Sequence, residues 1–461
     1  MCVRREIAAI DDPPDPCRLQ YPASPEAIVA ALSLDASAEN DALSSVYRRI
    51  TIRLIPLLAL CYFAAYLDRI NVGFAKLTML ADLRLTEADF GLGAGLFFLG
   101  YVLFETPSNL LLAKIGARVW IARIMVTWGL LSALCMVATT APQFHVLRFL
   151  LGVAEAGFLP GVLFYLSCWF PSHRRGRIFS LFLLGLPLSG VVGAPLSGWI
   201  MRHLDAQWAL AGWQWLFLLE ALPSIILGIL VFVLLPASPD QAKWLTSGEK
   251  QLLREALAAD EPAGAASHFA AGLRDWRIWL LGGVDFAILL TTYALGFWLP
   301  TLIKGAGVAD PLMIGLYASV PNFMTLIAMI LISRSSDRHR ERRLHIMIPF
   351  AIGATAMALL PFFPHSLSGS LILLSVASAM VTGVVPVYFS IPATFLRGPA
   401  AAAGFALACS LANIAGLVSN SLIGFAVSST GSAGSALWLF SAFLVIGIFL
   451  VKQLPPQLVN R

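Results

Sequence analysis

Residues 225–235 read IILGILVFVLL, an unbroken apolar run without a charged side chain. A second run, LLSALCMVA, occupies residues 130–138. Neither run alternates apolar and polar residues, as the strands of a membrane β-barrel do. A helix of about 20 apolar residues crosses a bilayer, and both runs lie inside segments of that length. The pattern therefore predicts membrane-spanning helices and argues against a β-barrel.

The composition of the whole chain agrees with this prediction. Of its 461 residues, 58% are hydrophobic and 12% are charged, and the mean hydropathy is +0.80. Soluble domains carry about 25% charged residues, so a soluble protein of this size could not cover its surface with so few charged side chains. The net charge is +5, and the basic residues form short clusters between apolar segments, which is typical of membrane proteins. We expect an integral protein of the lipid bilayer with no nucleic-acid partner.

Twelve apolar segments follow a polar tail over residues 1–50. A long polar stretch at 237–275 divides the segments six and six. We predict an all-α membrane protein with 12 transmembrane helices in two six-helix bundles, 51–236 and 276–453, and a C-terminal tail at 454–461. The expected spans are 52–75, 89–112, 118–139, 143–166, 177–200, 213–236, 277–302, 312–333, 344–363, 368–391, 399–426 and 434–452.

Lysine and arginine are distributed unevenly between the two sets of connecting loops. One set, which includes the loops around Arg118 and Arg338, is strongly basic. Cytoplasmic loops are enriched in Lys and Arg, so we expect a multi-pass inner-membrane protein with both termini in the cytoplasm. The alternate set carries only Lys76, Arg84, Arg202 and Lys304.

Two basic loops occupy equivalent positions in the two halves. Residues 114–118 join spans 2 and 3, and residues 333–338 join spans 8 and 9. This equivalence indicates an internal repeat. A six-plus-six parallel repeat with a long central loop resembles the layout of the major facilitator superfamily. For such a transporter we expect Arg118, Asp337 and Arg338 to be gating residues that pair across the cytoplasmic face and hold the outward-open state.

Ionisable side chains inside the spans are the candidate functional residues, because each costs at least about 2.5–3.5 kcal/mol to insert. Span 1 carries Asp68 and Arg69, and span 4 carries Arg148 and Glu155. Arg148 and Glu155 are close to two helical turns apart, so they share a face about 10 Å apart along the axis. Spans 1 and 4 run in opposite directions, which places the two arginines at similar depth. We expect them to face one cavity.

This charge pattern predicts a proton-coupled organic-anion carrier. Guanidinium groups stay protonated and can hold a carboxylate bidentately. A carboxylate in a low-dielectric cavity binds protons more readily, so Asp68 and Glu155 are the candidate proton-coupling residues. The alternative is an interhelical ion pair that only holds the helices together.

Other polar side chains in the spans are candidate substrate ligands. Tyr101 in span 2 could offer a hydroxyl to the substrate, and Tyr293 in span 7 could line the cavity or simply pack. Asn413 in span 11 could bind a hydroxyl or carboxylate, or it could form an interhelical hydrogen bond. Asp285 in span 7 receives no role from the sequence.

The sequence resembles the anion:cation symporter family of the major facilitator superfamily. The motifs that carry the resemblance include YLDRINVG at 66–73, RFLLGVAEAG at 148–157 and FWLP at 297–300. That family includes bacterial permeases for tartrate, phthalate, hydroxyphenylacetate and sugar acids, so the resemblance implies proton-coupled uptake of a small organic anion by alternating access. It implies that Arg69, Arg148, Tyr101, Asn413 and Ser390 serve the anion, and that Asp68 and Glu155 serve the proton.

Two positions depart from the pattern of these relatives. Ala113 stands where the superfamily often has an acidic residue in the loop between spans 2 and 3, so the gating ion pair is altered. Leu186 stands about where sugar-acid carriers can place a glutamine. An apolar residue there favours a less hydroxylated substrate, although tartrate-like acids, aromatic acids and sugar acids all fit the charge pattern.

Other classes of function are less consistent with the sequence. A membrane-embedded enzyme needs a nucleophile or metal constellation, and the scattered Cys and His residues suggest neither. We therefore expect no catalytic residues, no metal and no cofactor, with the proton as coupling ion. A transporter-like sensor would normally carry an added signalling domain. An anion exchanger or an exporter remains an alternative, and we expect a monomer because monomers are usual for the superfamily.

Overall fold

The computed structural model describes residues 25–260, 276–391 and 398–460, without the side chains of 25–41, 172–173, 398–408 and 458. The chain divides into two units, Met1–Arg48 and Arg49–Arg461. In the described part, 12 helices are long and apolar enough to cross a membrane. The prediction of an all-α membrane protein with twelve spans is confirmed.

The first six spans are built from eight helices. Local sequence signals mark their starts: Thr86 and Asp89 form a reciprocal capping box at the beginning of α2. The helices are α1 (Pro25–Leu83), α2 (Glu87–Ile115), α3 (Ala117–Leu134), α4 (Ala141–Glu155), α5 (Phe158–Ser167), α6 (Ser172–Leu183), α7 (Gly185–His203) and α8 (Gly212–Leu234).

The remaining helices follow a similar order. Asp310 caps α12 by accepting a hydrogen bond from the backbone N–H of Leu312 at 3.1 Å, and Pro311 is the first helical residue. The helices are α11 (Trp276–Gly305), α12 (Pro311–His339), α13 (Leu344–Leu359), α14 (Leu367–Gly383), α15 (Val385–Ser390), α17 (Gly398–Thr430), α18 (Gly434–Gln453) and α19 (Pro456–Val459). Short 3-10 turns are η1 (Cys135–Val137), η2 (Gln207–Ala209), η3 (Pro239–Gln241) and η4 (Leu360–Phe362).

Two segments that the sequence assigns to tails or loops contain helix. Helix α1 begins at Pro25, inside the predicted polar tail. The polar stretch between the halves holds α9 (Ser247–Ala258), whose start is capped by Thr246 and Glu249. Glu249 also forms a 2.8 Å ion pair with Arg49 of α1. Part of the predicted loop is therefore an ordered helix attached to the first span.

Spans 4, 5 and 10 are predicted over 143–166, 177–200 and 368–391, and each is built from two helices. Span 4 breaks between α4 and α5, span 5 breaks at Leu184, between α6 and α7, and span 10 breaks at Val384, between α14 and α15. Spans 4 and 10 have the same ordinal position in their respective halves. Interrupted helices at matching positions of two repeats are a feature of transporter binding sites.

The two halves are in close contact at one end of the spans. Helix α2 packs against α17, and α7 packs against α12. A methyl group at Gly198 would lie 2.4 Å from the Pro311 carbonyl oxygen, and one at Gly315 would lie 2.3 Å from that of Ala194. The backbones of α7 and α12 can therefore approach only because these positions lack a side chain. We call this end, which is opposite the basic loops, the far end.

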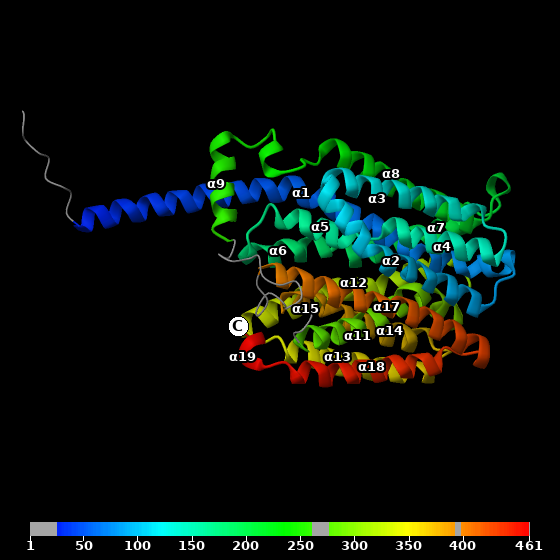
Figure 1. Ribbon diagram of the computed structural model, residues 1–461. Coiled ribbons are helices and arrows are strands. Elements are labelled where there is room, and N and C mark those ends of the chain that lie inside the picture. Colours follow the sequence, from blue (N-terminus) through cyan, green and yellow to red (C-terminus); the bar gives the residue numbers. More distant parts are fainter. Residues whose placement is uncertain (1–24, 261–275, 392–397, 461) are drawn as a thin grey trace, which may run out of the picture. The chain divides into compact units, whose positions relative to one another are not determined.

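Charged side chains also connect the halves at the far end. Arg202 at the end of α7 forms a 2.6 Å ion pair with Asp310 at the start of α12. Lys76 of α1 forms a 2.6 Å ion pair with Glu87, and its ammonium lies 3.4 Å from the ring centroid of Trp298 in α11. In Figure 1 the helices of the first half (blue to green) lie above those of the second half (green to red).

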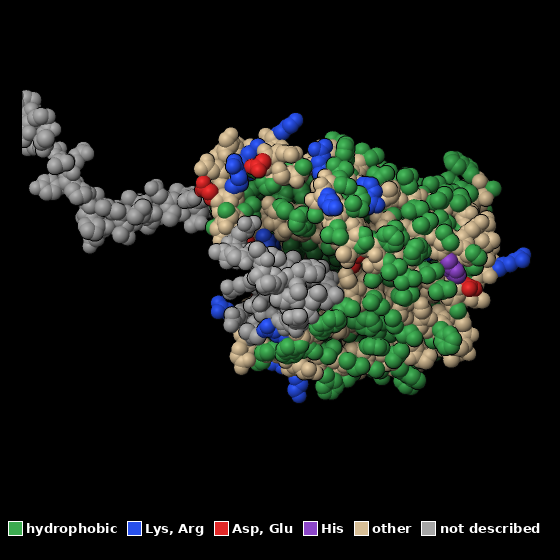
Figure 2. Space-filling model, in the orientation of Figure 1, with side chains coloured by type: hydrophobic (Ala, Val, Ile, Leu, Met, Phe, Trp, Pro, Cys, Tyr) green, Lys and Arg blue, Asp and Glu red, His purple; other side chains and the backbone are tan. Residues whose placement is uncertain are grey.

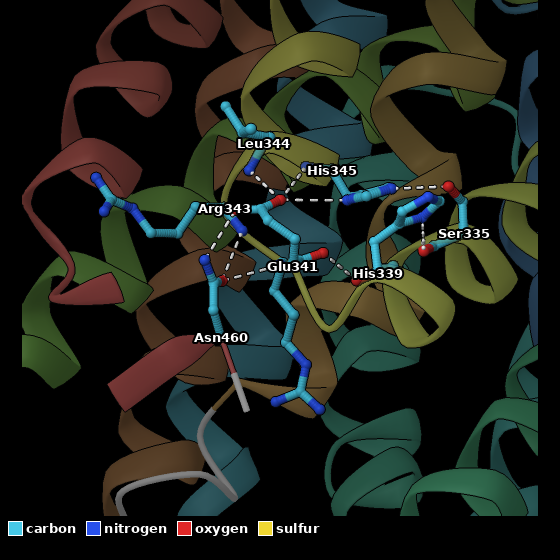
Figure 3. Close-up of polar contacts among 9 residues, drawn as sticks. Ser335, His339, Glu341, Arg343, Leu344, His345 and Asn460 are labelled. Carbon is cyan, nitrogen blue, oxygen red and sulfur yellow. Dashed lines mark hydrogen bonds and ion pairs between the residues drawn. The ribbon is translucent and has the colours of Figure 1, made fainter. Parts of the chain in front are cut away.

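Hydrophobic side chains cover the flank of the helices in Figure 2, and most of the visible Lys and Arg lie toward the side of α9 and α19. At that side, the loop between α12 and α13 holds the C-terminal segment (Figure 3). The Asn460 side-chain oxygen accepts the backbone N–H of Arg342 at 2.9 Å, and its amide donates to Glu341 at 3.0 Å. Arg343 donates to the carbonyl of Lys452 at 2.6 Å. The described part of the predicted tail is therefore fixed to the second half.

Candidate functional site

A cavity with two lobes lies between the halves. Both lobes are lined by Tyr66, Arg69, Leu186, Thr292 and Tyr293. The first, which we call the neutral lobe, adds hydroxyl and amide groups to these shared residues. The second, which we call the acidic lobe, adds two carboxylates. The neutral lobe has Ser189, Asn322, Thr325, Ser378 and Thr382, and the acidic lobe has Glu155 and Asp285.

Arg69 lies where the two lobes meet. Its guanidinium forms an ion pair with Glu155 and donates a 3.5 Å hydrogen bond to the Tyr293 hydroxyl. The Tyr66 and Tyr101 ring centroids lie 4.9 and 5.6 Å from the guanidinium carbon. The Nε atom of Arg69 is buried without a hydrogen-bond partner among the described residues. The guanidinium thus keeps a donor for an acceptor that enters the cavity.

Glu155 is presented to Arg69 by the interruption of span 4. It is the last residue of α4, and Gly157, with φ of +86°, interrupts the helix before the span continues as α5. Ser108 of α2 donates a 2.7 Å hydrogen bond to the freed carbonyl of Ala156. A methyl group at Gly157 would lie 2.6 Å from the Ser108 oxygen. The span predicted over 143–166 is present, but it consists of two helices, and α2 stabilises the interruption between them.

The carboxylate of Glu155 stands at an unfavourable place for a negative charge. The C-terminal end of a helix carries a partial negative charge, and the Glu155 side chain is only 2% exposed. The guanidinium of Arg69 compensates for both effects. This pair is therefore the feature of the cavity most sensitive to the arrival of a proton or of another anion.

Arg148 does not line either lobe, contrary to the expectation that both arginines face one cavity. It is completely buried, and its three guanidinium nitrogens have no hydrogen-bond partner among the described residues. The ring centroid of Phe97 lies 5.0 Å from the Arg148 guanidinium carbon and 5.3 Å from that of Arg69. Both guanidinium groups thus lie close to the Phe97 ring, in agreement with the similar depth predicted for the two arginines. A substrate-binding role for Arg148 stays a prediction.

Asp68 lies inside the N-terminal bundle and lines neither lobe. Its carboxylate accepts hydrogen bonds from Trp128 and Ser132 at 2.9 Å each and from Ser224 at 2.5 Å. These donors come from α3 and α8, so Asp68 joins α1 to two neighbouring helices. The geometry supports a structural role, and proton coupling by Asp68 stays a prediction.

Three of the four remaining candidate ligands lie at the cavity. Tyr101 and Asn413 line the acidic lobe, and Tyr293 lines both lobes. The Tyr293 hydroxyl donates to the Asn413 side-chain oxygen at 3.1 Å. Ser390 lines neither lobe, and its hydroxyl donates to the Val387 carbonyl at 2.7 Å.

The expected gate at the basic end is not formed in this conformation. Arg118 donates to the Phe232 carbonyl at 2.7 Å, which is a contact within the first half. Asp337 and Arg338 are exposed, and among the described residues no ion pair joins them to the first half. The contacts between halves described above are instead at the far end. The gating role of these three residues in an outward-open state stays a prediction.

Several cavity residues receive no role from the sequence. Asp285 lies in the acidic lobe, and the hydroxyls of Thr292 and Thr382 are 2.9 Å apart in the neutral lobe. A polar residue in an apolar span is the only signal that could have singled them out. No group of three His, Cys, Asp or Glu residues suited to a metal ion occurs in the described ranges.

Comparisons with known proteins agree with this architecture. A family model described as Major Facilitator Superfamily matches residues 58–420. NicT of Pseudomonas putida, a candidate metabolite transport protein, is 58% identical over 419 residues, covering 90% of this chain and 96% of NicT. A candidate tartrate transporter of Agrobacterium vitis is 43% identical over 427 residues, covering 90% of this chain and 92% of the relative.

The fold is also found among solved structures. The xylose transporter XylE from E. coli, in a partially occluded inward open conformation, matches with a TM-score of 0.65 and 16% identity, covering 88% of this chain and 98% of XylE. That identity supports the fold alone. The named relatives are transporters, so this chain is a multi-pass membrane transporter and not an enzyme. With the family model matching most of its length, the chain belongs to the Major Facilitator Superfamily.

Proposed function

We propose that this transporter carries a small organic carboxylate into the cell together with a proton, by alternating access. The observation that carries the proposal is the ion pair of Arg69 and Glu155 at the cavity. A guanidinium group can bind a carboxylate through two parallel hydrogen bonds. In this structure the carboxylate bound to the Arg69 guanidinium is that of Glu155. A substrate carboxylate and Glu155 therefore compete for one guanidinium.

Protonation of Glu155 decides that competition. Ionised Glu155 neutralises Arg69, and a substrate anion would then bring a second negative charge into a buried site. Protonated Glu155 gives up the ion pair, so the substrate carboxylate can take its place without changing the net charge of the cavity. One proton and one carboxylate are thus bound together, and loss of the proton returns Glu155 to Arg69 and expels the anion.

Alternating access requires the contacts at the far end to separate. The pairs Arg202–Asp310 and Lys76–Trp298 connect the halves there, and we propose that this end faces the outside of the inner membrane, with both termini in the cytoplasm. Opening of the far end would expose the cavity to the outside. Arg118, Asp337 and Arg338 would then pair at the cytoplasmic end.

The class of substrate is supported by chemistry and by the relatives. Arg69 selects an anion. Leu186 lines both lobes, and this apolar side chain favours a less hydroxylated substrate. One relative is named for tartrate. The cavity is enclosed by a single chain, in keeping with a monomer, and the proposed mechanism uses no cofactor besides the proton.

Transport by the purified protein in liposomes tests the proposal. We expect an inward gradient of one pH unit, at zero membrane potential, to drive up to about tenfold accumulation of labelled tartrate relative to protein-free liposomes, since one pH unit is equivalent to about 1.4 kcal/mol. Glu155→Gln should lose accumulation and keep counterflow, whereas Arg69→Gln should lose both. Glu249→Gln, on α9, is the matched control and should behave as the wild type.

Two results would overturn the proposal. Accumulation that persists after the proton gradient is collapsed would exclude coupling. Exchange of internal for external carboxylate, without any accumulation in the wild type, would identify an anion exchanger instead.

A further inference from the structure

We propose that Asp285 is a positioning residue of the transport cycle. As a neutral carboxyl group it ties α15, the inner segment of span 10, to α11 through Tyr388, and it does not carry the coupling proton. This inference rests on the proposed function, which assigns that proton to Glu155. It adds the element that closes the acidic lobe toward the basic end and the residue that holds this element in place.

Helix α15 lies between the acidic lobe and the basic end. It is the continuation of span 10 after the interruption at Val384, and its Val385 and Phe389 line the acidic lobe. Across the halves α15 contacts α6, which is the inner segment of span 5 and is separated from α7 at Leu184. Leu183 of α6 lines the same lobe. These two short segments, one from each half, therefore form the inner wall of the acidic lobe.

Tyr388 fixes α15 to α11, the first span of the second half. Its side chain is completely buried, and its hydroxyl donates a 3.2 Å hydrogen bond to the carbonyl of Leu281 in α11. The same hydroxyl is the hydrogen-bond partner of Asp285, one turn further along α11. Asp285 is 3% exposed, and no described Lys, Arg or His forms an ion pair with it. One hydroxyl thus connects α15 to two groups of α11.

The shared hydroxyl indicates which form of Asp285 the structure holds. A phenol has a single proton, and Tyr388 gives it to the Leu281 carbonyl. Asp285 can then hydrogen-bond to Tyr388 only by donating its own proton, so its carboxyl group is neutral. Burial without a cationic partner also disfavours the charged form. An ionised Asp285 would take the Tyr388 proton instead and end the hydrogen bond to Leu281, which would loosen α15.

Glu155 and Asp285 therefore have different roles, although both line the acidic lobe. Glu155 is paired with Arg69, and a substrate carboxylate can take over that guanidinium. Asp285 has a hydroxyl partner from its own half, with which an entering carboxylate has no charge to exchange. Its proton stays in place while that of Glu155 is exchanged. Its contribution is to keep α15 attached to α11 while the two halves move.

Counterflow and accumulation of labelled tartrate in liposomes test this role. Asp285→Asn keeps a neutral hydrogen-bond donor and should transport as the wild type does, with the same dependence of accumulation on the pH gradient. Asp285→Leu and Tyr388→Phe remove the hydrogen bond between the side chains. Each should lower the maximal rate of counterflow about fivefold, the effect of one buried hydrogen bond, and should change the half-saturating concentration less than about twofold. Asp240→Asn, outside the cavity, is the control.

Pulsed electron paramagnetic resonance reports on α15 without any substrate. Spin-labelled cysteines replace Arg177 of α6 and Ser390 at the end of α15, in a background without native cysteines. The distance distribution of Asp285→Asn should match that of the wild type, and those of Asp285→Leu and Tyr388→Phe should be broader. The double variant Asp285→Leu/Tyr388→Phe should be no broader than either single variant, because both remove the same contact.

The outcomes separate this inference from the proposed function. Loss of accumulation with retained counterflow in Asp285→Asn would identify Asp285 as a proton carrier and overturn the inference. A wild-type rate and distance distribution in Tyr388→Phe would also overturn it, and this variant, which lacks a single oxygen atom, decides the question even if Asp285→Leu does not fold. Retained accumulation in Glu155→Gln would refute the proposed function and leave the connection of α15 to α11 standing.

Discussion

Replacing Lys76 with methionine tests the contact that joins the two halves at the far end. Lys76 is 3% exposed, and its ammonium lies 3.4 Å from the ring centroid of Trp298 in the other half. Its ion pair with Glu87 lies within the first half, so it persists when the halves separate. The cation–π contact with Trp298 is therefore one of the interactions that far-end opening must break, together with the Arg202–Asp310 ion pair.

The size of the expected effect follows from the burial of this contact. A desolvated cation–π contact contributes about 2 kcal/mol, which is equivalent to a factor of about 30 in an equilibrium constant. Lys76→Met keeps a long side chain against the ring but removes the charge. We therefore expect the ratio of far-end-closed to far-end-open molecules to fall about 30-fold.

Pulsed electron paramagnetic resonance between spin labels on the two halves measures that ratio. Arg84 and Ser432 are exposed near the far end, one in each half, and labelled cysteines there report its opening in a background without native cysteines. The longer distance should gain population in Lys76→Met, while Lys243→Met, on the polar segment between the halves, should not change it. An unaltered distance distribution in Lys76→Met would refute the assignment of this contact as a gate.

Two further predictions concern stability. Gly157→Ala should lower the melting temperature, because the left-handed backbone costs an alanine about 1–2 kcal/mol and its methyl would meet Ser108. The double variant with Ser108→Ala should regain the part of the stability that this clash removes. An unchanged melting temperature in Gly157→Ala would contradict the interruption of span 4 at Gly157. Burial of Glu341 raises its pKa, but hydrogen bonds from Leu344, His345 and Asn460 outweigh this and lower the pKa below its usual value. The ionised carboxylate therefore stabilises the fold at pH values above the unfolded-state pKa of about 4.3, and this stabilisation is lost as the pH falls through the folded-state pKa. Glu341→Gln should be less stable than the wild type at pH 7, and scanning calorimetry should show a smaller difference in melting temperature at pH 3.5.

The architecture could be predicted from sequence because hydropathy alone determines which segments enter a membrane. The twelve spans and the two-half repeat needed no knowledge of neighbouring helices. The interruption after Glu155 was not predicted, because it depends on Gly157 together with Ser108 of another helix. Sequence offers Gly157 as a hint, but many glycines in membrane helices leave the helix continuous.

The candidate site was predicted only in part, because a sequence does not show which helices pack against each other. Spacing along one helix gives the relative depth of Arg69, Arg148 and Glu155, but it does not say which helix each side chain faces. Asp68 was expected at the cavity and lies instead among donors from α3 and α8. Asp285 received no role, because the cavity wall to which it belongs is built from segments distant in the sequence.

Proton uptake on substrate binding tests the coupling between Arg69 and Glu155 most directly. The purified protein, in lightly buffered detergent solution near neutral pH, is mixed with benzoate or tartrate, and the change in pH is recorded. Wild-type protein should take up about one proton for each substrate molecule bound, and Glu155→Gln should bind the substrate with almost no proton uptake. Carboxylate binding by the wild type without proton uptake, or equal uptake in Glu155→Gln, would contradict the exchange of Glu155 for substrate on Arg69.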